Sequence, residues 1–183
     1  PSEGWNMKNQ STPATAGEAS VQASVVAHLD GQAEAIALLE KAEKRFPDDA
    51  GLTAMRASLL LELDRREEAH VALDRARAID SDDIGYLTTN ARYLSAVSSD
   101  INGALADLKR AVEIAPGNDA AWDDLAGIQS DRGATIEADA AHRHAVALNP
   151  DNIAVRTNYA LFLMGHEQMT AAKRELDAAE ALD

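Results

Sequence analysis

Two histidines, His142 and His144, are the first residues whose type suggests metal chemistry, because neutral imidazole is the commonest metal ligand among side chains. Two residues along a helix correspond to a rotation of about 200°, so these side chains would lie on opposite faces. A pair of helical ligands needs a spacing of three or four residues. The sequence therefore predicts no metal site here. His142 is expected in the interior instead, since it takes the position of Leu108 in the repeat described below.

The acidic segment 80–85, Asp-Ser-Asp-Asp-Ile-Gly, is faintly similar to a calcium-binding loop. Ile84 stands at a ligand position, and Ala91 stands where a bidentate glutamate is required, so the segment is expected to be a turn between helices. Glycine-rich phosphate loops and the G-x-S-x-G and H-E-x-x-H motifs are absent, and the chain contains no cysteine. The sequence thus predicts a protein that is not an enzyme, without a metal or a cofactor.

A cluster of acids, Asp123, Asp124 and Asp131, has two interpretations: a site for a lysine or arginine of a partner, or a solvated helix face. The whole chain carries 31 acidic and 17 basic residues, a formal net charge of −14. Such a chain repels phosphate backbones and anionic membranes, so nucleic-acid binding and membrane insertion are disfavoured. The expected partner is a neutral or basic protein or peptide; solubility alone is the other explanation of the charge.

No stretch approaches the roughly 18 apolar residues of a membrane span, and no signal peptide is evident. The expected protein is soluble, in the cytoplasm or the periplasm; the absence of cysteine fits both compartments. Residues 1–15 read as a flexible polar leader in which Trp5 is the only large apolar side chain. Residues 1–6 could be a leftover before a native start at Met7.

Alanine recurs with a period that sets the architecture of the chain. The three series are Ala23, Ala57, Ala91, Ala126, Ala160; Ala35, Ala69, Ala104, Ala138, Ala172; and Ala42, Ala76, Ala111, Ala145, Ala179. Each series advances in steps of about 34 residues, and one step in each is longer by a single residue. This period predicts one supersecondary unit copied five times. Alanine suits points where helices cross closely, because a larger side chain there would be overpacked.

Apolar residues three to four apart predict two helices in each unit, and Pro, Asp and Asn mark the turns that follow the second helix. The expected helices are 16–29, 32–46, 50–63, 66–79, 84–97, 101–114, 119–132, 135–148, 153–166 and 169–182. The one extra residue lies between Ala91 and Ala104, where it should lengthen the turn inside the third unit.

Residues 119–152 carry the clearest family pattern, with Trp122, Leu125, Gly133, Ala138 and Pro150 in order. This unit resembles the tetratricopeptide repeat, and five units in phase extend the resemblance over residues 16–183. The other units are looser, and Ala126 stands where the family usually has glycine.

The resemblance implies an all-α fold, a right-handed superhelical solenoid of five helix–turn–helix repeats whose first helices line a concave groove. The repeats would be 16–49, 50–83, 84–118, 119–152 and 153–183, following the leader 1–15.

The resemblance also implies a non-catalytic protein–protein interaction scaffold that binds a peptide or partner protein in that groove. The family's inner-face positions give the candidate contacts Met55, Ser58, Thr88, Thr89, Arg92, Asp123, Asp124, Asn158 and Leu161. The cationic clamp of chaperone-binding members is absent. Arg92 could pair with a ligand carboxylate or with the neighbouring acids, and the small residues of the face could instead serve tight curvature alone.

Two other functions remain open: an accessory or regulatory domain of a larger enzyme or secretion system, and a self-assembling scaffold that pairs through the ends of its stack. In the last helix, Lys173 and Glu180 stand in phase with Leu105 and Val112. Polar residues at these normally covered positions predict that this helix partly caps itself. The alternatives are that it packs on a twin or that a further domain was removed.

Overall fold

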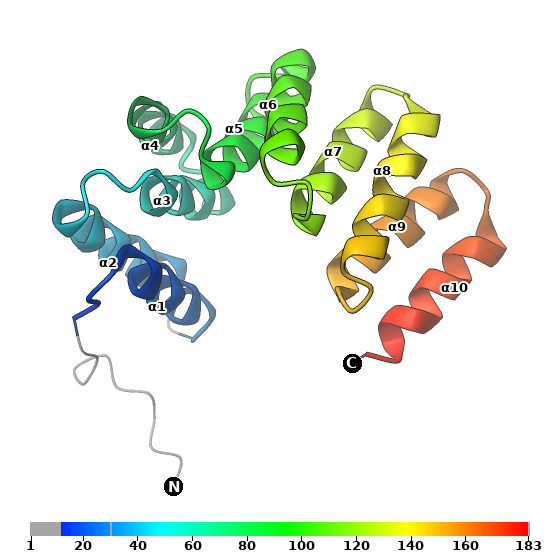
Figure 1. Cartoon of the computed structure of the whole chain (residues 1–183), viewed down its shortest axis with the longest axis horizontal. Coiled ribbons are helices and arrows are strands. Elements are labelled where there is room, and N and C mark those ends of the chain that lie inside the picture. Colours follow the sequence, from blue (N-terminus) through cyan, green and yellow to red (C-terminus); the bar gives the residue numbers. More distant parts are fainter. Residues whose placement is uncertain (1–11, 30, 183) are drawn as a thin grey trace, which may run out of the picture. The chain divides into compact units, whose positions relative to one another are not determined.

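Ten α-helices account for most of the protein in a computed structural model that describes residues 12–29 and 31–182 (Figure 1). Residues 12–29 and 31–182 contain no β-strand. Residues 1–11 of the predicted leader, with Trp5, and Asp30 of a predicted turn lie outside the described residues.

The helices begin and end within two residues of their expected positions. They are α1 Ala16–Leu29, α2 Gln32–Arg45, α3 Ala50–Glu62, α4 Arg66–Ile79, α5 Ile84–Ala96, α6 Ile101–Ile114, α7 Asp119–Asp131, α8 Thr135–Leu148, α9 Ile153–Gly165 and α10 Met169–Glu180. The turn between α5 and α6 spans 97–100 and holds the extra residue of the third unit, as expected.

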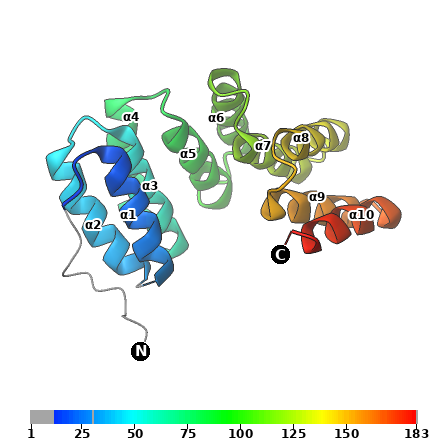
Figure 2. The same cartoon turned by 60° about the horizontal axis from the view of Figure 1, so that its bottom comes forward.

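The chain forms two compact units, and residues 1–80 make the first. In it, α1, α2 and α3 pack against one another, and α4 packs on α3 (Figure 2). Leu39, Leu52 and Leu60 are the largest fully buried side chains of this unit, together with Val26. Each helix of this unit turns an apolar stripe inward and leaves most of its charges outside.

Residues 81–183 make the second unit, which holds α5 to α10. Each helix packs on the next one in sequence, and α7 also contacts both α5 and α9. A cluster of Tyr159, Phe162 and Leu163 joins α9 to small residues of α8 and α10. This arrangement places α5, α7 and α9, the first helices of their pairs, side by side.

All fifteen periodic alanines are buried, with at most 5% of their surface exposed. The expectation from their spacing is therefore confirmed: they lie where helices approach too closely for a larger side chain.

Side chains of Asp and Asn fix the start of four first helices. Asp49, Asp83, Asn118 and Asn152 each accept a hydrogen bond from the backbone N–H three residues ahead, at 2.8 to 3.2 Å. This is the N-cap predicted from the turn sequences, and it satisfies a donor that the helix itself leaves unpaired. Because all four caps recur at one repeat position, residues at equal distances beyond them occupy equivalent places on successive helices.

The turns inside the pairs share a left-handed residue. Gly31 and Gly133 have positive φ, and so do Asp64, Ser99 and Glu167, whose φ values lie between 56 and 59°. Glycine adopts this conformation without strain, whereas an L-residue with a Cβ is strained there by about 1 kcal/mol.

Glu167→Gly should therefore stabilise the protein by about 0.5 kcal/mol, since relief of strain exceeds the entropic cost of glycine. A shift of the urea midpoint at constant m-value would measure it. Gln168→Gly is the matched control, because Gln168 has φ of −86° and gains nothing from glycine. Equal effects of the two substitutions would contradict the strain at Glu167.

Candidate functional site

Seven of the nine sequence-predicted contact residues fall at two positions on the first helices, and the other two, Thr88 and Asp123, stand five residues after an N-cap. Met55, Thr89, Asp124 and Asn158 each stand six residues after an N-cap, and Ser58, Arg92 and Leu161 stand nine residues after one. Six and nine residues beyond the cap lie on one helix face, since three residues make nearly one turn. In the second unit, the packing of α7 on α5 and α9 brings these faces together.

Asp123 ties three helices of the second unit to one another. Its Oδ1 lies 3.0 Å from His142 Nδ1 on α8, and its Oδ2 accepts a hydrogen bond from Asn158 Nδ2 on α9 at 2.6 Å. Only 11% of the Asp123 side chain is exposed. Both carboxylate oxygens are thus engaged inside the unit, so Asp123 positions α8 and α9 against α7.

His142 is buried, as its place in the repeat predicted. Its ring stacks on Tyr159 at a centroid distance of 5.4 Å and lies 5.1 Å from Phe162. The Tyr159 hydroxyl donates to Asp139 at 2.8 Å and accepts from Arg143 Nε at 3.1 Å. Sequence reasoning placed His142 in the interior but missed this aromatic and polar network, because its members are 16 to 20 residues apart in sequence.

Asp124 behaves differently from its neighbour Asp123. Burial raises the pKa of its carboxyl from 3.8 to about 6; Arg92 lowers that pKa, and the charge of Asp123 raises it. Within the described residues, no hydrogen bond to the Asp124 carboxylate is formed. A desolvated carboxylate beside a guanidinium is a group that gains from a further hydrogen-bond donor.

The remaining predicted contact residues of the second unit differ in their exposure to solvent. Thr89 is buried and serves packing, whereas Thr88 donates its hydroxyl to the Ile84 carbonyl at 2.9 Å and stays partly exposed. Arg92 and Asn158 are exposed, and 59% of the Leu161 surface is open to solvent. The surface made by Thr88, Arg92, Asp124, Asn158 and Leu161 is hereafter the first-helix face.

Met55 and Ser58 lie half-buried on α3 in the first unit. Val21, at the position of Met55 on α1, is 66% exposed. The first helices of this unit therefore present apolar and hydroxyl groups without an acid at these positions.

A buried charge cluster in the first unit escaped the sequence analysis. Glu43 on α2 accepts from Arg56 Nε on α3 at 2.5 Å and pairs with Arg75 on α4 at 3.2 Å. Only 4% of the Glu43 side chain is exposed. The signal available in the sequence was Arg56 at a position where the family usually has leucine.

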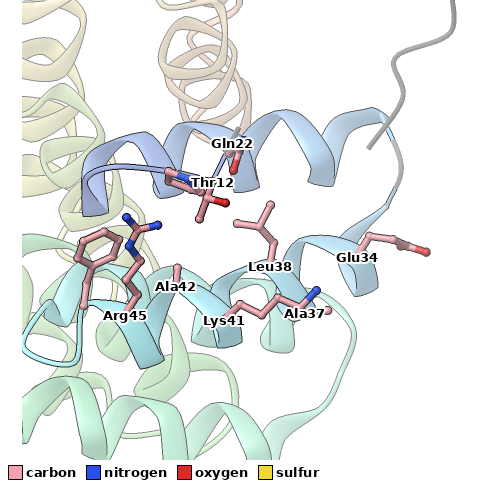
Figure 3. Close-up of a pocket in the computed structure, with 10 residues that line it drawn as sticks. Thr12, Gln22, Glu34, Ala37, Leu38, Lys41, Ala42 and Arg45 are labelled. Atoms are coloured by element: carbon pink, nitrogen blue, oxygen red, sulfur yellow. The ribbon is translucent and has the colours of Figure 1, made fainter. Parts of the chain in front are cut away.

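A cavity of about 410 Å³ lies against α2 in the same unit. Figure 3 shows Leu38, Lys41, Ala42 and Arg45 of α2 on one side of it, and Thr12 with Gln22 of α1 on the other. Phe46, Pro13 and Ala37 complete the apolar part of the lining, and Glu34 adds one acid to the two cations, Lys41 and Arg45. Such a site suits an apolar group whose negative charge meets the cations.

Residues 12–29 and 31–182 contain no group of three or more His, Asp and Glu side chains arranged to hold a metal ion. Within those same ranges, no helix has both the length and the apolar character to cross a membrane.

The sequence matches the tetratricopeptide repeat family over residues 33–92. A comparison with curated proteins found no match.

Solved structures resemble the protein over most of its length. The thermophilic TPR protein TTC0263 of Thermus thermophilus is 18% identical with a TM-score of 0.79, covering 89% of each chain. MamA residues 41–end of Desulfovibrio magneticus RS-1 is 15% identical with a TM-score of 0.64, covering 94% of this chain and 97% of that one. YrrB, described as a TPR protein with an unusual peptide-binding site, is 17% identical with a TM-score of 0.57, covering 92% of this chain and 87% of that one.

At these identities the likeness concerns the fold alone. It confirms the expected class, an all-α solenoid of helix–turn–helix repeats, and ten helices agree with about five repeats. This fold is typical of non-catalytic interaction scaffolds.

Proposed function

Because this chain is a tetratricopeptide repeat protein, we propose that it binds a peptide or partner protein along its first helices, with Asp124 as the central contact of the second unit. The observation that carries the proposal is the Asp124 carboxylate, which is desolvated and accepts no hydrogen bond within residues 12–29 and 31–182. A partner donor would supply the missing bond. Hydrogen bonds to charged groups contribute about 1.5 to 3 kcal/mol.

The surroundings of Asp124 favour a ligand of mixed character. Leu161 offers an exposed apolar contact, and Asn158 and Thr88 offer polar contacts. The positive charge of Arg92 partly offsets the negative charge of Asp124. A lysine, an arginine or a backbone N–H next to an apolar residue fits this set. The net charge of −14 favours a neutral or basic partner over nucleic acid.

YrrB, by its description, has a peptide-binding site, and it shares this fold. That description supports a peptide ligand for the present chain without locating its site. Met55 and Ser58 of α3 are proposed as the contacts of the first unit.

The test is selection of peptides from a displayed random library on the full chain, followed by affinity measurement. We expect basic peptides to be enriched and Asp124→Asn to weaken them about tenfold, equivalent to about 1.4 kcal/mol. Asp131→Asn, at the exposed end of α7, removes the same charge and should leave affinity within about twofold. Equal affinity of the wild type and Asp124→Asn would remove Asp124 from the site.

A further inference from the structure

Ion pairs hold α2 to the pair α3–α4 at the junction between them. Glu43 of α2 reaches Arg56 of the next first helix and Arg75 of the next second helix. The chain thus uses one glutamate and two cations to hold successive pairs together in the first unit.

The positions of the two arginines in this junction recur one repeat earlier. Gln22 takes the repeat position of Arg56, and Lys41 takes the repeat position of Arg75. Both border the cavity against α2, together with Leu38 and Ala42 (Figure 3). Lys41 is exposed and has no ion-pair partner within the described residues.

The position of the glutamate in this junction, and that of the leucine one turn before it, recur on α10. Glu180 is in phase with Glu43, and Leu176 is in phase with Leu39. Leu39 is fully buried, whereas Leu176 is 39% exposed and Glu180 is exposed. No described helix other than α9 packs on α10. Lys173, on the same face, pairs with Asp177 at 2.6 Å, so the face keeps a net negative charge around Glu180.

We propose that a second copy of this chain docks the face of α10 formed by Leu176 and Glu180 onto the cavity face of α2, with Glu180 paired to Lys41. The contact repeats the register of Glu43 on Arg56 and Arg75. Leu176 packs toward the apolar lining of the cavity. Thr12 and Pro13, which also line the cavity, contact the docked helix or move aside. A head-to-tail contact of this kind uses different surfaces on the two copies and propagates into a chain of molecules.

Charge supports a second copy as the occupant. The protein is strongly acidic, yet two cations, Lys41 and Arg45, line this cavity beside a single acid, Glu34. The α10 face offers an acid at the matching repeat position and an exposed leucine beside it. Opposite charges at matched positions guide docking and reject wrong registers.

The test is sedimentation velocity over a concentration series with the full chain. The wild type should self-associate, and Glu180→Lys or Lys41→Glu should each weaken association about tenfold by placing like charges together. An equimolar mixture of the two variants should associate again, because the lysine introduced in one variant then meets the glutamate introduced in the other. Added salt should weaken the wild-type association.

Glu137→Lys on α8 and Lys109→Glu on α6 are matched controls, since both are exposed charges elsewhere. They should associate as the wild type does. A wild type that stays monomeric throughout, or a mixture that associates no better than its two components, would overturn the proposal.

Discussion

Replacing Glu43 with valine should destabilise the protein by about 2 to 3 kcal/mol. The substitution leaves Arg56, whose side chain is 15% exposed, without its carboxylate partner in a packed junction. Breaking a buried ion pair by removing one partner costs about 3 to 5 kcal/mol, and the partial exposure of Arg56 lowers that figure. Arg75 is 46% exposed and can turn to water.

The second unit indicates a second substitution that should restore the stability lost in Glu43→Val. The positions of Glu43 and Arg56 are occupied there by Val112 and Leu125, which are both buried. Glu43→Val combined with Arg56→Leu should therefore recover most of the stability, because apolar packing replaces the ion pair.

Urea unfolding of the wild type, both single variants and the double variant gives the coupling free energy directly. Glu40→Val is the control, since Glu40 is exposed on the same helix and should change stability by less than about 0.5 kcal/mol. A double variant less stable than Glu43→Val alone would show that the charges, not the packing, are required at this junction.

Asp124→Asn should stabilise the protein at neutral pH while it weakens binding. The pKa of this carboxyl is raised from 3.8 to about 6, chiefly by burial, so the ionised form is disfavoured in the folded state. A pKa raised this far corresponds to a cost of about 3 kcal/mol for the ionised form, and an amide, which also needs hydrogen bonds, should recover about 1 to 2 kcal/mol of that cost.

The raised pKa also fixes the direction of the pH dependence. Above pH 7 the folded state bears the full cost of the ionised carboxylate. As the pH falls through about 6, the folded protein takes up a proton that the unfolded chain binds only near 3.8, and this cost disappears. The stability advantage of Asp124→Asn should thus be largest near pH 8 and vanish near pH 4.

Thermal or urea unfolding of the wild type and of Asp124→Asn from pH 4 to 8 measures the difference in their free energies of unfolding. The contributions of titratable groups that the two proteins share cancel in this difference. Asp131→Asn serves again as the control and should show no pH-dependent gain. A constant difference across the range would mean that Asp124 is not the titrating group.

The fold could be predicted almost completely because it depends on local signals. Helix bounds follow from caps such as Asn118, from apolar spacing and from Gly133 in its left-handed turn. The burial of every periodic alanine follows from a repeat that places the same contact in each pair. Each of these patterns lies within a single repeat unit and recurs along the chain, so one sequence suffices to recognise it.

The candidate site was less predictable because its properties depend on neighbouring helices. Asp123 and Asp124 are adjacent and chemically identical, yet one bonds His142 and Asn158 and the other is left desolvated. Only the packing of α8 and α9 on α7 distinguishes them. Likewise, Thr89 looks polar in sequence but is buried, although Asn158 at the same repeat position is exposed.

Binding of a ligand along the first helices is tested most directly by chemical-shift mapping with a library-selected peptide. Binding on the first-helix face predicts that the largest amide shifts lie on α5, α7 and α9, near Thr88, Asp124 and Leu161. Shifts confined to α6, α8 and α10 would contradict it.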